Sequence, residues 1–298
     1  MKILISSYTL DLSGVPTFTL TLYNELQKRR YEVEVYSPLG GSLSSKVDAK
    51  SDLASVVRPD IIIAQHNICA ESMRAVFSDV PMIFYTHHPE YDGEQPPSFE
   101  CEWYMSINED TTRNLISKGV PASKITIVRD FIDTDRYRPV SPINSTLENV
   151  LYVSNRKKWR TYENIKKACG ILGVNFRAVG SPYGRARSIE NDINKADLVI
   201  GWARCLMEAM ACGRPVISYD KEIGDGYLDY KTYLRSRVRN FGITCEHKYT
   251  VEELVNEMKK YDPKDGEINR AIILKEHNAI RGVDQISRVI GGMSNGRA

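Results

Sequence analysis

The sequence predicts an α/β protein with two doubly wound, Rossmann-like domains, and three observations lead to this prediction. Residues 196–220 read as a buried strand, a glycine-started turn, a helix of good helix formers from about residue 204 to 211, and a second strand. Residues 2–36 repeat this order of strand, loop, amphipathic helix and strand. The length of 298 residues suits two domains, because each half is large enough to bury a core of its own.

The composition is that of an ordinary globular protein, with 42% hydrophobic and 26% charged residues. The apolar runs are shorter than the ~20 residues of a membrane span, and the chain enters a strand at Lys2 instead of a signal peptide. We therefore expect a cytoplasmic protein without a transmembrane segment. The six cysteines form no Cys-x-x-Cys pair and have no metal-ligand spacing, which indicates reduced thiols.

Charge is unevenly spread along the chain, although the net charge is only +2. Residues 1–139 carry 14 Lys and Arg against 19 Asp and Glu, whereas residues 140–298 carry 26 against 19. A basic C-terminal half suits a ligand that bears a diphosphate, and an acidic N-terminal half argues against that half gripping a nucleic-acid backbone. Simple drift of surface charge would give the same pattern.

The first predicted helix follows a turn at Gly14. It places Phe18, Leu22 and Leu26 at helical spacing, as expected for a helix that covers one face of a sheet. As a plain turn residue, Gly14 would need no ligand.

Two histidines follow a buried strand of the first half. The strand at 80–86 runs directly into His87 and His88. Ligands of doubly wound sheets bind beyond the carboxyl ends of strands, which makes this pair a candidate site. The pair could equally be structural or part of a metal site, but no further His or Cys stands at ligand spacing.

The second half begins after residues 140–145, a Ser- and Pro-bearing stretch without periodicity, where we place the interdomain hinge. The domains are therefore expected at 1–140 and 141–283, and the last helical turns, about 284–298, could pack back on the first domain. We expect a flexible glycine loop at 222–227, and a helix from residue 251 to 260 capped by Thr250.

A basic run follows the predicted strand at 150–154 and contains Arg156, Lys158 and Arg160. Arginine offers a planar fork to phosphate oxygens and lysine a point charge, so cations beyond the end of a strand suit a phosphate. Taken alone, the run could also be a solvated loop.

The start of the helix at residue 204 is a second candidate for phosphate binding. The first-turn N–H groups around Ala203, Arg204 and Cys205 have no partner inside the helix, and the helix dipole is positive there. Glu208 lies about one turn further in, where its carboxylate could accept two ribose hydroxyls. The alternative is a solvated glutamate on an alanine-rich helix.

The run from Leu206 to Ile217 resembles the C-terminal signature of the family 4 (group 1) glycosyltransferases, which have the GT-B fold. The resemblance implies two Rossmann-like domains that face a central cleft. Glu208 matches the second of two family glutamates, the one that holds the donor ribose. The first falls on Ile200, so the carboxylate that usually contacts the donor sugar is missing. Residues 201–204 resemble instead a subgroup that carries Gly-x-Gly-Arg at this place, and residues 106–139 resemble the family's linker.

The resemblance also implies an activity and a set of site residues. It implies transfer of a hexosyl group from a UDP- or GDP-linked sugar, with retention of configuration, without a metal and without a further cofactor. Arg156 matches the family's phosphate-binding arginine, and Lys158 or Arg160 the second cation. His87, with His88 in reserve, matches a polar residue that faces the cleft, and Gly14 is what survives of a Gly-Gly loop. The catalytic roles therefore fall on His87, Arg156 and Glu208.

Two other functions compete with this prediction. A nucleotide-sugar epimerase would share the donor pocket but would need catalytic acids that the sequence does not reveal. A non-catalytic protein that binds nucleotide sugars is made credible by Ile200 in place of a carboxylate. The acceptor is open between a glycan, a lipid, a protein and a modified nucleic acid.

Overall fold

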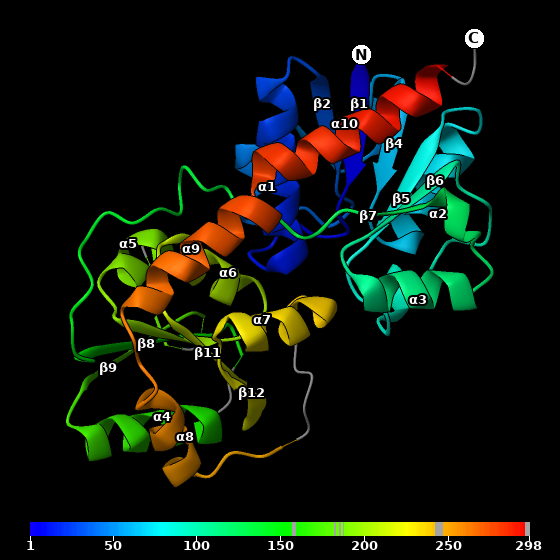
Figure 1. The fold of residues 1–298 in the computed structure, drawn as a ribbon. Coiled ribbons are helices and arrows are strands. Elements are labelled where there is room, and N and C mark those ends of the chain that lie inside the picture. The colour runs from blue at the N-terminus through cyan, green and yellow to red at the C-terminus, as the bar shows by residue number, and fades with distance from the viewer. Residues whose placement is uncertain (157–158, 182, 185, 187, 242–246, 296–298) are drawn as a thin grey trace. The chain divides into compact units, whose positions relative to one another are not determined.

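The computed structural model describes residues 1–298 except 157–158, 182, 185, 187, 242–246 and 296–298 (Figure 1). The chain divides into two compact units, one formed by Met1–Phe131 with Ala279–Ala298 and the other by Ile132–Asn278. The chain crosses between the units twice, and the two crossing segments contact each other through residues of the second unit. The N–H of Ile132 donates to the carbonyl of His277 at 2.8 Å, and Ile132 pairs with Asn278 in an isolated β-bridge. These junctions lie at 131/132 and 278/279, whereas the sequence places them at 140/141 and 283/284.

The first unit contains, within the described residues, a parallel sheet of seven strands in the order β3-β2-β1-β4-β5-β6-β7. The strands are β1 (Lys2–Ser6), β2 (Glu32–Tyr36), β3 (Ala49–Lys50), β4 (Ile61–Ala64), β5 (Met82–Thr86), β6 (Trp103–Ser106) and β7 (Ile125–Ile127). The helices are α1 (Gly14–Lys28), α2 (Asn67–Val76), α3 (Glu109–Ser117) and α10 (Ala279–Asn295), with short 3₁₀ turns at Ser44–Lys46, Leu53–Ser55, Asp92–Glu94 and Ala122–Lys124.

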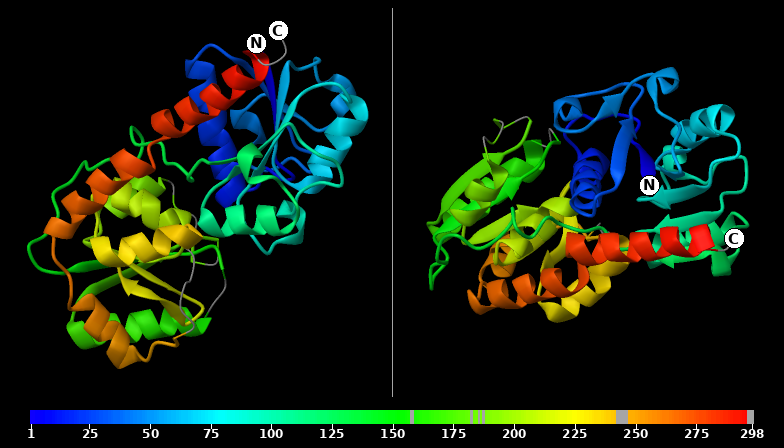
Figure 2. Two further views of the ribbon diagram at one scale, coloured as in Figure 1. Left: turned by 45° about the vertical axis from the view of Figure 1, so that its right-hand side comes forward. Right: turned by 90° about the horizontal axis from the view of Figure 1, so that it is seen from above.

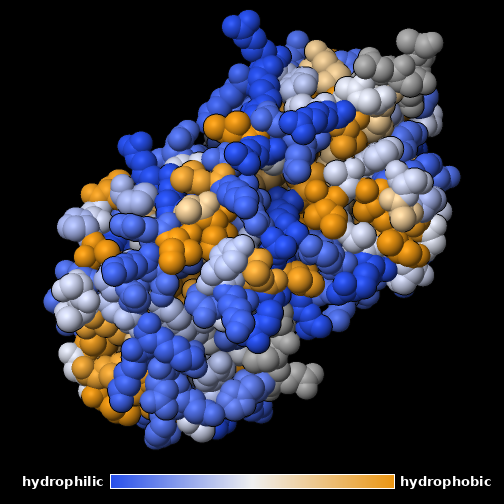
Figure 3. All heavy atoms as spheres, in the orientation of Figure 1, coloured by the Kyte–Doolittle hydropathy of each residue, from blue (hydrophilic) through white to orange (hydrophobic). Residues whose placement is uncertain are grey.

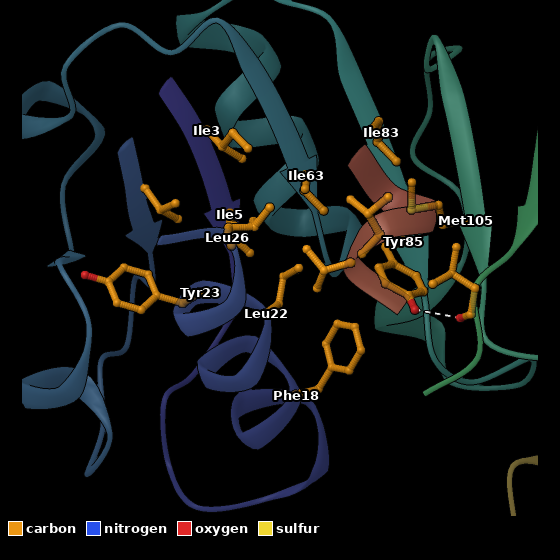
Figure 4. Close-up of a cluster of buried hydrophobic side chains, with 14 of the residues drawn as sticks. Ile3, Ile5, Phe18, Leu22, Tyr23, Leu26, Ile63, Ile83, Tyr85 and Met105 are labelled. Carbon is orange, nitrogen blue, oxygen red and sulfur yellow. Dashed lines mark hydrogen bonds between the residues drawn. The ribbon is translucent and has the colours of Figure 1, made fainter. Parts of the chain in front are cut away.

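Helices cover both faces of this sheet (Figures 1 and 2). Alternate strand residues such as Ile3 and Ile5 pack with α1 and α10, while Leu4 packs with α2 and α3 on the other face. Figure 4 shows the α1 side of this core, where Phe18 lies near Tyr85, and Tyr85 donates its hydroxyl proton to the carbonyl of Val128 at 2.6 Å. The apolar stripe predicted on the first helix is confirmed, because Phe18, Leu22 and Leu26 are all buried.

The second unit contains a five-stranded sheet in the order β12-β11-β10-β8-β9 among its described residues. Its strands are β8 (Asn149–Val153), β9 (Asn175–Val179), β10 (Leu198–Gly201), β11 (Val216–Asp220) and β12 (Ile223–Tyr227); all pairs are parallel except β11 with β12. The helices are α4 (Trp159–Leu172), α5 (Ile189–Asn194), α6 (Arg204–Ala211), α7 (Tyr230–Ser236), α8 (Val251–Met258) and α9 (Lys264–Glu276), and a 3₁₀ turn spans Arg237–Arg239.

The strands of the second sheet also send alternate side chains to opposite faces. Leu151, Val199 and Val216 pack with α5, α6, α7 and α9, whereas Tyr152 and Ile200 pack with α4 and α8. This doubly wound arrangement was predicted from the strand–helix–strand order at 196–220.

The prediction of a flexible glycine loop at 222–227 is wrong, because Ile223–Tyr227 forms β12, antiparallel to β11. The connecting turn consists of Lys221 and Glu222, both with positive φ (54° and 69°). This is the backbone of a two-residue hairpin turn, which usually carries Asn-Gly or Asp-Gly. The turn here is Lys-Glu instead, so the sequence gives no sign of a hairpin.

On the face shown in Figure 3, hydrophobic residues occur in small groups among hydrophilic ones. Within the described ranges, no helix combines the length and the apolar character that crossing a bilayer requires.

Candidate functional site

The carboxyl ends of β8 and β10 form the natural ligand position of the second unit. β8 is followed by β9 on one side, while the next strand along the chain, β10, lies on the other side of β8. The connections therefore leave these two neighbouring strands in opposite directions, and the crevice between such strand ends is where doubly wound sheets bind ligands. Residues 154–156 and 201–204 stand at this place.

Gly201 allows the two strand ends and the start of α6 to pack closely. A Cβ atom on Gly201 would lie 2.5 Å from the sulfur of Cys205 and 2.9 Å from the carbonyl oxygen of Val153. The sulfur of Cys205 in turn accepts the N–H of Trp202 at 3.2 Å and lies 3.7 Å from the same Val153 carbonyl. Cys205, predicted as a backbone contact for phosphate, thus also holds the end of β8 against the start of α6.

Arg156 is held at this edge by Asp220, the last residue of β11. Its guanidinium lies 2.9 Å from Asp220 and 4.7 Å from the ring centroid of Trp202, yet 51% of the side chain is exposed. Asp220 is buried and also accepts the hydroxyl of Tyr152 at 3.2 Å. The arginine is therefore fixed on its inner side and open on its outer side, as a phosphate-binding group should be.

Lys221 joins this group, although no motif in the sequence singles it out. Its ammonium lies 5.1 Å from the ring centroid of Trp202, and its backbone N–H donates to Asp220 at 2.8 Å. In the sequence, Lys221 is only a lysine that follows the strand ending in Asp220. Because the hairpin was not predicted, its turn was not expected near the strand ends.

Among the described residues, no side chain caps the start of α6. Ala203, the residue before the helix, has φ 55° and ψ −128° and offers no side-chain cap to the first-turn N–H groups. Its own N–H donates to the carbonyl of Phe241 at 2.9 Å. A non-glycine residue in this backbone region is strained, and strain of this kind concentrates at functional sites.

Arg204 and Glu208, predicted to contact phosphate and ribose, form an ion pair with each other. Arg204 Nε lies 3.3 Å from Glu208 Oε1, and both residues are buried. The charge of Glu208 also acts on Tyr137 and Arg136. Burial is the main reason why the pKa of Tyr137 is raised, and the negative charge of Glu208 raises it too; the same charge contributes to the raised pKa of Arg136.

The charges of Arg156 and Glu208 both affect the pKa of the Cys205 thiol. The pKa of this thiol is raised to about 12, mainly by burial; the charges of Glu208 and Asp220 also raise it, while the N–H of Trp202 and the charge of Arg156 lower it. Arg156 lies against the ring of Trp202, just before α6, and Glu208 lies on α6, so both belong to one region of the second unit.

The other predicted cations behave differently. Arg160 pairs with Glu222 at 3.1 Å and its side chain is 80% exposed, so it lies on the outer side of the hairpin turn. Lys158 lies outside the described residues. Ile200, which falls where the family has a carboxylate, is fully buried in the core beside α4 and α8.

In the first unit, His87 stands at the carboxyl end of β5. Its Nε2 lies 2.8 Å from the side-chain oxygen of Gln65, and its ring stacks on Tyr85 (centroids 4.8 Å apart) and meets Phe18 edge-on (4.7 Å). The Gln65 amide nitrogen donates to two other groups, so its oxygen faces the imidazole, which must carry its proton on Nε2.

His88 has a different role from its neighbour. It is exposed, and its Nδ1 accepts the N–H groups of Glu90 and Tyr91 at 3.0 and 3.2 Å, so its ring shapes the following loop. Gly14 is exposed at the first residue of α1, and a Cβ atom there would meet nothing within 4 Å. The backbone at Gly14 therefore does not demand glycine.

Glu94 is a buried carboxylate at the same strand end, and no pattern in the sequence predicts it. It accepts the backbone N–H groups of His87 and His88, the latter at 3.2 Å, and the hydroxyl of Thr86 lies 3.4 Å away. Burial raises the pKa of Glu94 to about 7, against the effect of these hydrogen bonds.

Solved structures resemble the chain along nearly all of its length. Anabaena HepE in complex with UDP has a TM-score of 0.71 at 14% identity, over 98% of this chain and 100% of HepE. An alpha-glucosyltransferase in complex with UDP and a DNA containing an HMU base has a TM-score of 0.66 at 12% identity, over 98% and 99% of the two chains. The lipopolysaccharide outer core galactosyltransferase WaaB has a TM-score of 0.63 at 12% identity, over 98% and 100%.

No protein-family model and no curated protein matches the sequence. At 12 to 14% identity the structural likeness concerns the fold. The chain has the α/β architecture of GT-B glycosyltransferase structures, with two Rossmann-like domains.

Proposed function

We propose that this protein transfers a hexosyl group from a nucleoside-diphosphate sugar to an acceptor, and that the donor binds at the carboxyl ends of β8 and β10. The observation that carries the proposal is the half-exposed guanidinium of Arg156, fixed by Asp220 next to the uncapped start of α6. Cations and helix N–H groups at a strand end are the groups that bind a diphosphate. The similar HepE structures hold UDP and UDP-glucose, which supports a UDP-linked donor; a GDP-linked donor is the alternative.

The proposed chemistry follows from charge. The bond between the sugar and the diphosphate breaks, a bond between the sugar and the acceptor forms, and the acceptor loses a proton, which the leaving diphosphate can take up. Negative charge grows on the leaving phosphate as its bond to the sugar breaks. Arg156 and the first-turn N–H groups of α6 are in place before the reaction and would stabilise this charge most in the transition state. No metal is required in this scheme, and we propose retention of configuration on the basis of the family resemblance.

Two further residues have proposed roles. Glu208 would accept the ribose hydroxyls, which requires its pairing with Arg204 to adjust when the ligand enters. His87 donates its Nε2 proton to Gln65, so on the acceptor side in the first unit it would act through Nδ1, as a hydrogen-bond acceptor. The candidate acceptors are a glycan, a lipid, a protein and a modified nucleic acid.

The test is nucleotide release from a panel of UDP- and GDP-sugars, with and without candidate acceptors. We expect acceptor-dependent release that Arg156→Ala lowers by about tenfold or more, which corresponds to the loss of one hydrogen bond to a charged group. Arg177→Ala, an exposed arginine on β9 paired with Asp192, is the matched control and should leave release unchanged. Equal rates for wild type and Arg156→Ala would contradict the assigned site.

A second function, binding of a nucleotide sugar without turnover, is favoured by Ile200. This residue is fully buried in the sheet, so no carboxylate can reach the donor sugar from that position. Saturable binding of a nucleotide sugar with no release for any acceptor would favour this function. Interconversion of the sugar without acceptor would instead favour an epimerase.

A further inference from the structure

The β11–β12 hairpin brings a second cation to the proposed phosphate site. Arg156 and Lys221 come from separate strand ends, yet each lies about 5 Å from the centroid of the same indole ring, that of Trp202 (4.7 and 5.1 Å). Within this distance a cation is attracted by the face of an aromatic ring, with tryptophan the strongest partner. Trp202 therefore gathers two positive charges beside the start of α6.

We propose that Lys221 is the second diphosphate-binding cation of this protein, and that Trp202 positions it next to Arg156. This assignment rests on the proposed function and names the residue that completes its donor site. It replaces the expectation from resemblance, which put the second cation on Lys158 or Arg160.

The backbone of the hairpin turn supports a specific role for Lys221. Lys221 and Glu222 both adopt positive φ, which costs free energy for residues other than glycine and asparagine. The turn is nevertheless anchored on two sides: the N–H of Lys221 donates to Asp220, and the N–H of Glu222 donates to the hydroxyl of Thr161 at 3.2 Å. The turn is thus fixed in the conformation that holds the lysine over Trp202.

The charges of the hairpin separate Lys221 from Arg160. Glu222 pairs with Arg160 on the outer side of the turn and neutralises it. Asp220 lies on the inner side, where it pairs with the Arg156 guanidinium. From Lys221 it accepts the backbone N–H. Arg156, Lys221 and Asp220 together carry one net positive charge beside the start of α6, where a diphosphate would add its negative charges.

The two cations are placed for two phosphates. Both lie close to one indole ring, so a diphosphate near Trp202 could contact both at once, while a single phosphate has fewer oxygens to share. A nucleoside without phosphate gains nothing from either cation. The series UDP, UMP and uridine therefore measures the contribution of each cation, and GDP, GMP and guanosine do the same if guanine is the preferred base.

The experiment is a binding titration of this series with wild type, Lys221→Met, Lys221→Arg and Lys195→Met. Methionine keeps the length of the side chain at an exposed position, so the fold is preserved, and the urea unfolding midpoint checks this. Lys195 is an exposed lysine just before the amino end of β10, at the opposite edge of the sheet, and serves as the matched control.

We expect Lys221→Met to weaken the nucleoside diphosphate by about tenfold or more, which is the loss of one hydrogen bond to a charged group. The monophosphate should lose less, the nucleoside nothing, and Lys221→Arg should restore most of the loss. Trp202→Leu should weaken the diphosphate selectively too, because both cations lose their support. A role in folding alone would lower the unfolding midpoint without distinguishing diphosphate from nucleoside.

Failure of the two proposals can be told apart. If wild type binds neither UDP nor GDP, the proposed function is overturned, and the assignment of Lys221 with it. If wild type binds a nucleoside diphosphate and Lys221→Met binds it equally well, the assignment of Lys221 is overturned while the donor site stands. Equal losses for Lys221→Met and Lys195→Met would also overturn it, since they would reflect net charge only.

Discussion

Glu94 makes the stability of the first unit depend on pH. Its carboxylate is 3% exposed and accepts the N–H groups of His87 and His88 at the end of β5. Burial raises its pKa from 4.5 to about 7. The folded protein therefore binds this proton more tightly than the unfolded chain does.

The sign of the effect follows from this difference in proton binding. Below about pH 4.5 both states hold the proton and the stabilising contribution is complete; it is lost as the pH rises and is gone above about pH 7. At about 1.4 kcal/mol per pKa unit, the full effect is about 3 kcal/mol. His66 Nε2 lies 4.0 Å from the carboxylate, but burial lowers the pKa of His66, so its ring is uncharged at neutral pH and does not offset the buried charge.

Glu94→Gln removes this titration. We expect the stability of the variant relative to wild type to increase by about 2–3 kcal/mol between about pH 5 and about pH 8, because part of the full effect lies below pH 5. Urea unfolding followed by circular dichroism measures the two curves. Glu90→Gln, exposed in the same loop, is the matched control and should keep a constant offset from wild type. Parallel curves for Glu94→Gln and wild type would refute the argument from burial.

Three further predictions concern stability, each checked by urea or thermal unfolding. Gly201→Ala should cost about 1–3 kcal/mol because its Cβ would collide with the Val153 carbonyl, whereas Gly14→Ala, in open space, should change stability by less than about 1 kcal/mol; equal effects would contradict the packing at Gly201. Asp197→Ala should cost about 2–4 kcal/mol because this buried carboxylate accepts several N–H groups, including that of Asn149 at 2.8 Å, and a neutral result would mean that water replaces it. Thr250→Ala should cost about 1 kcal/mol through loss of the α8 cap, and Thr250→Ser should recover most of it.

Elements with a strong local pattern were predictable from the sequence. The helix expected from residue 204 to 211 is α6 with the same bounds, and Thr250 caps α8 as predicted. Both predictions rest on interactions within a few residues, namely good helix formers with a glycine stop and a side chain that accepts an N–H of the next turn. Local signals of this kind survive in the folded protein.

Contacts between distant segments were not predictable. The turn at Lys221 and Glu222 carries no Asn-Gly signal, and its geometry is held by Asp220 and Thr161. Glu94 lies in a loop whose composition says nothing about burial, yet it satisfies two N–H groups at the end of β5. In both cases the partner is chosen by the tertiary structure, so a single sequence contains the residues but no sign of the pairing.

The charges around α6 divide into an inner pair and an outer group, and the two should contribute differently to ligand binding. Arg204 and Glu208 are buried and compensate each other, because an isolated charge there would be costly. Arg156 and Lys221 keep their outer sides in water and can exchange hydration for phosphate oxygens at little cost. A ligand that must separate the inner pair gains only if it replaces both partners, whereas a diphosphate at the outer group adds attraction without breaking a buried contact. Binding energy should therefore come mainly from the phosphates, and discrimination between ligands from the inner pair.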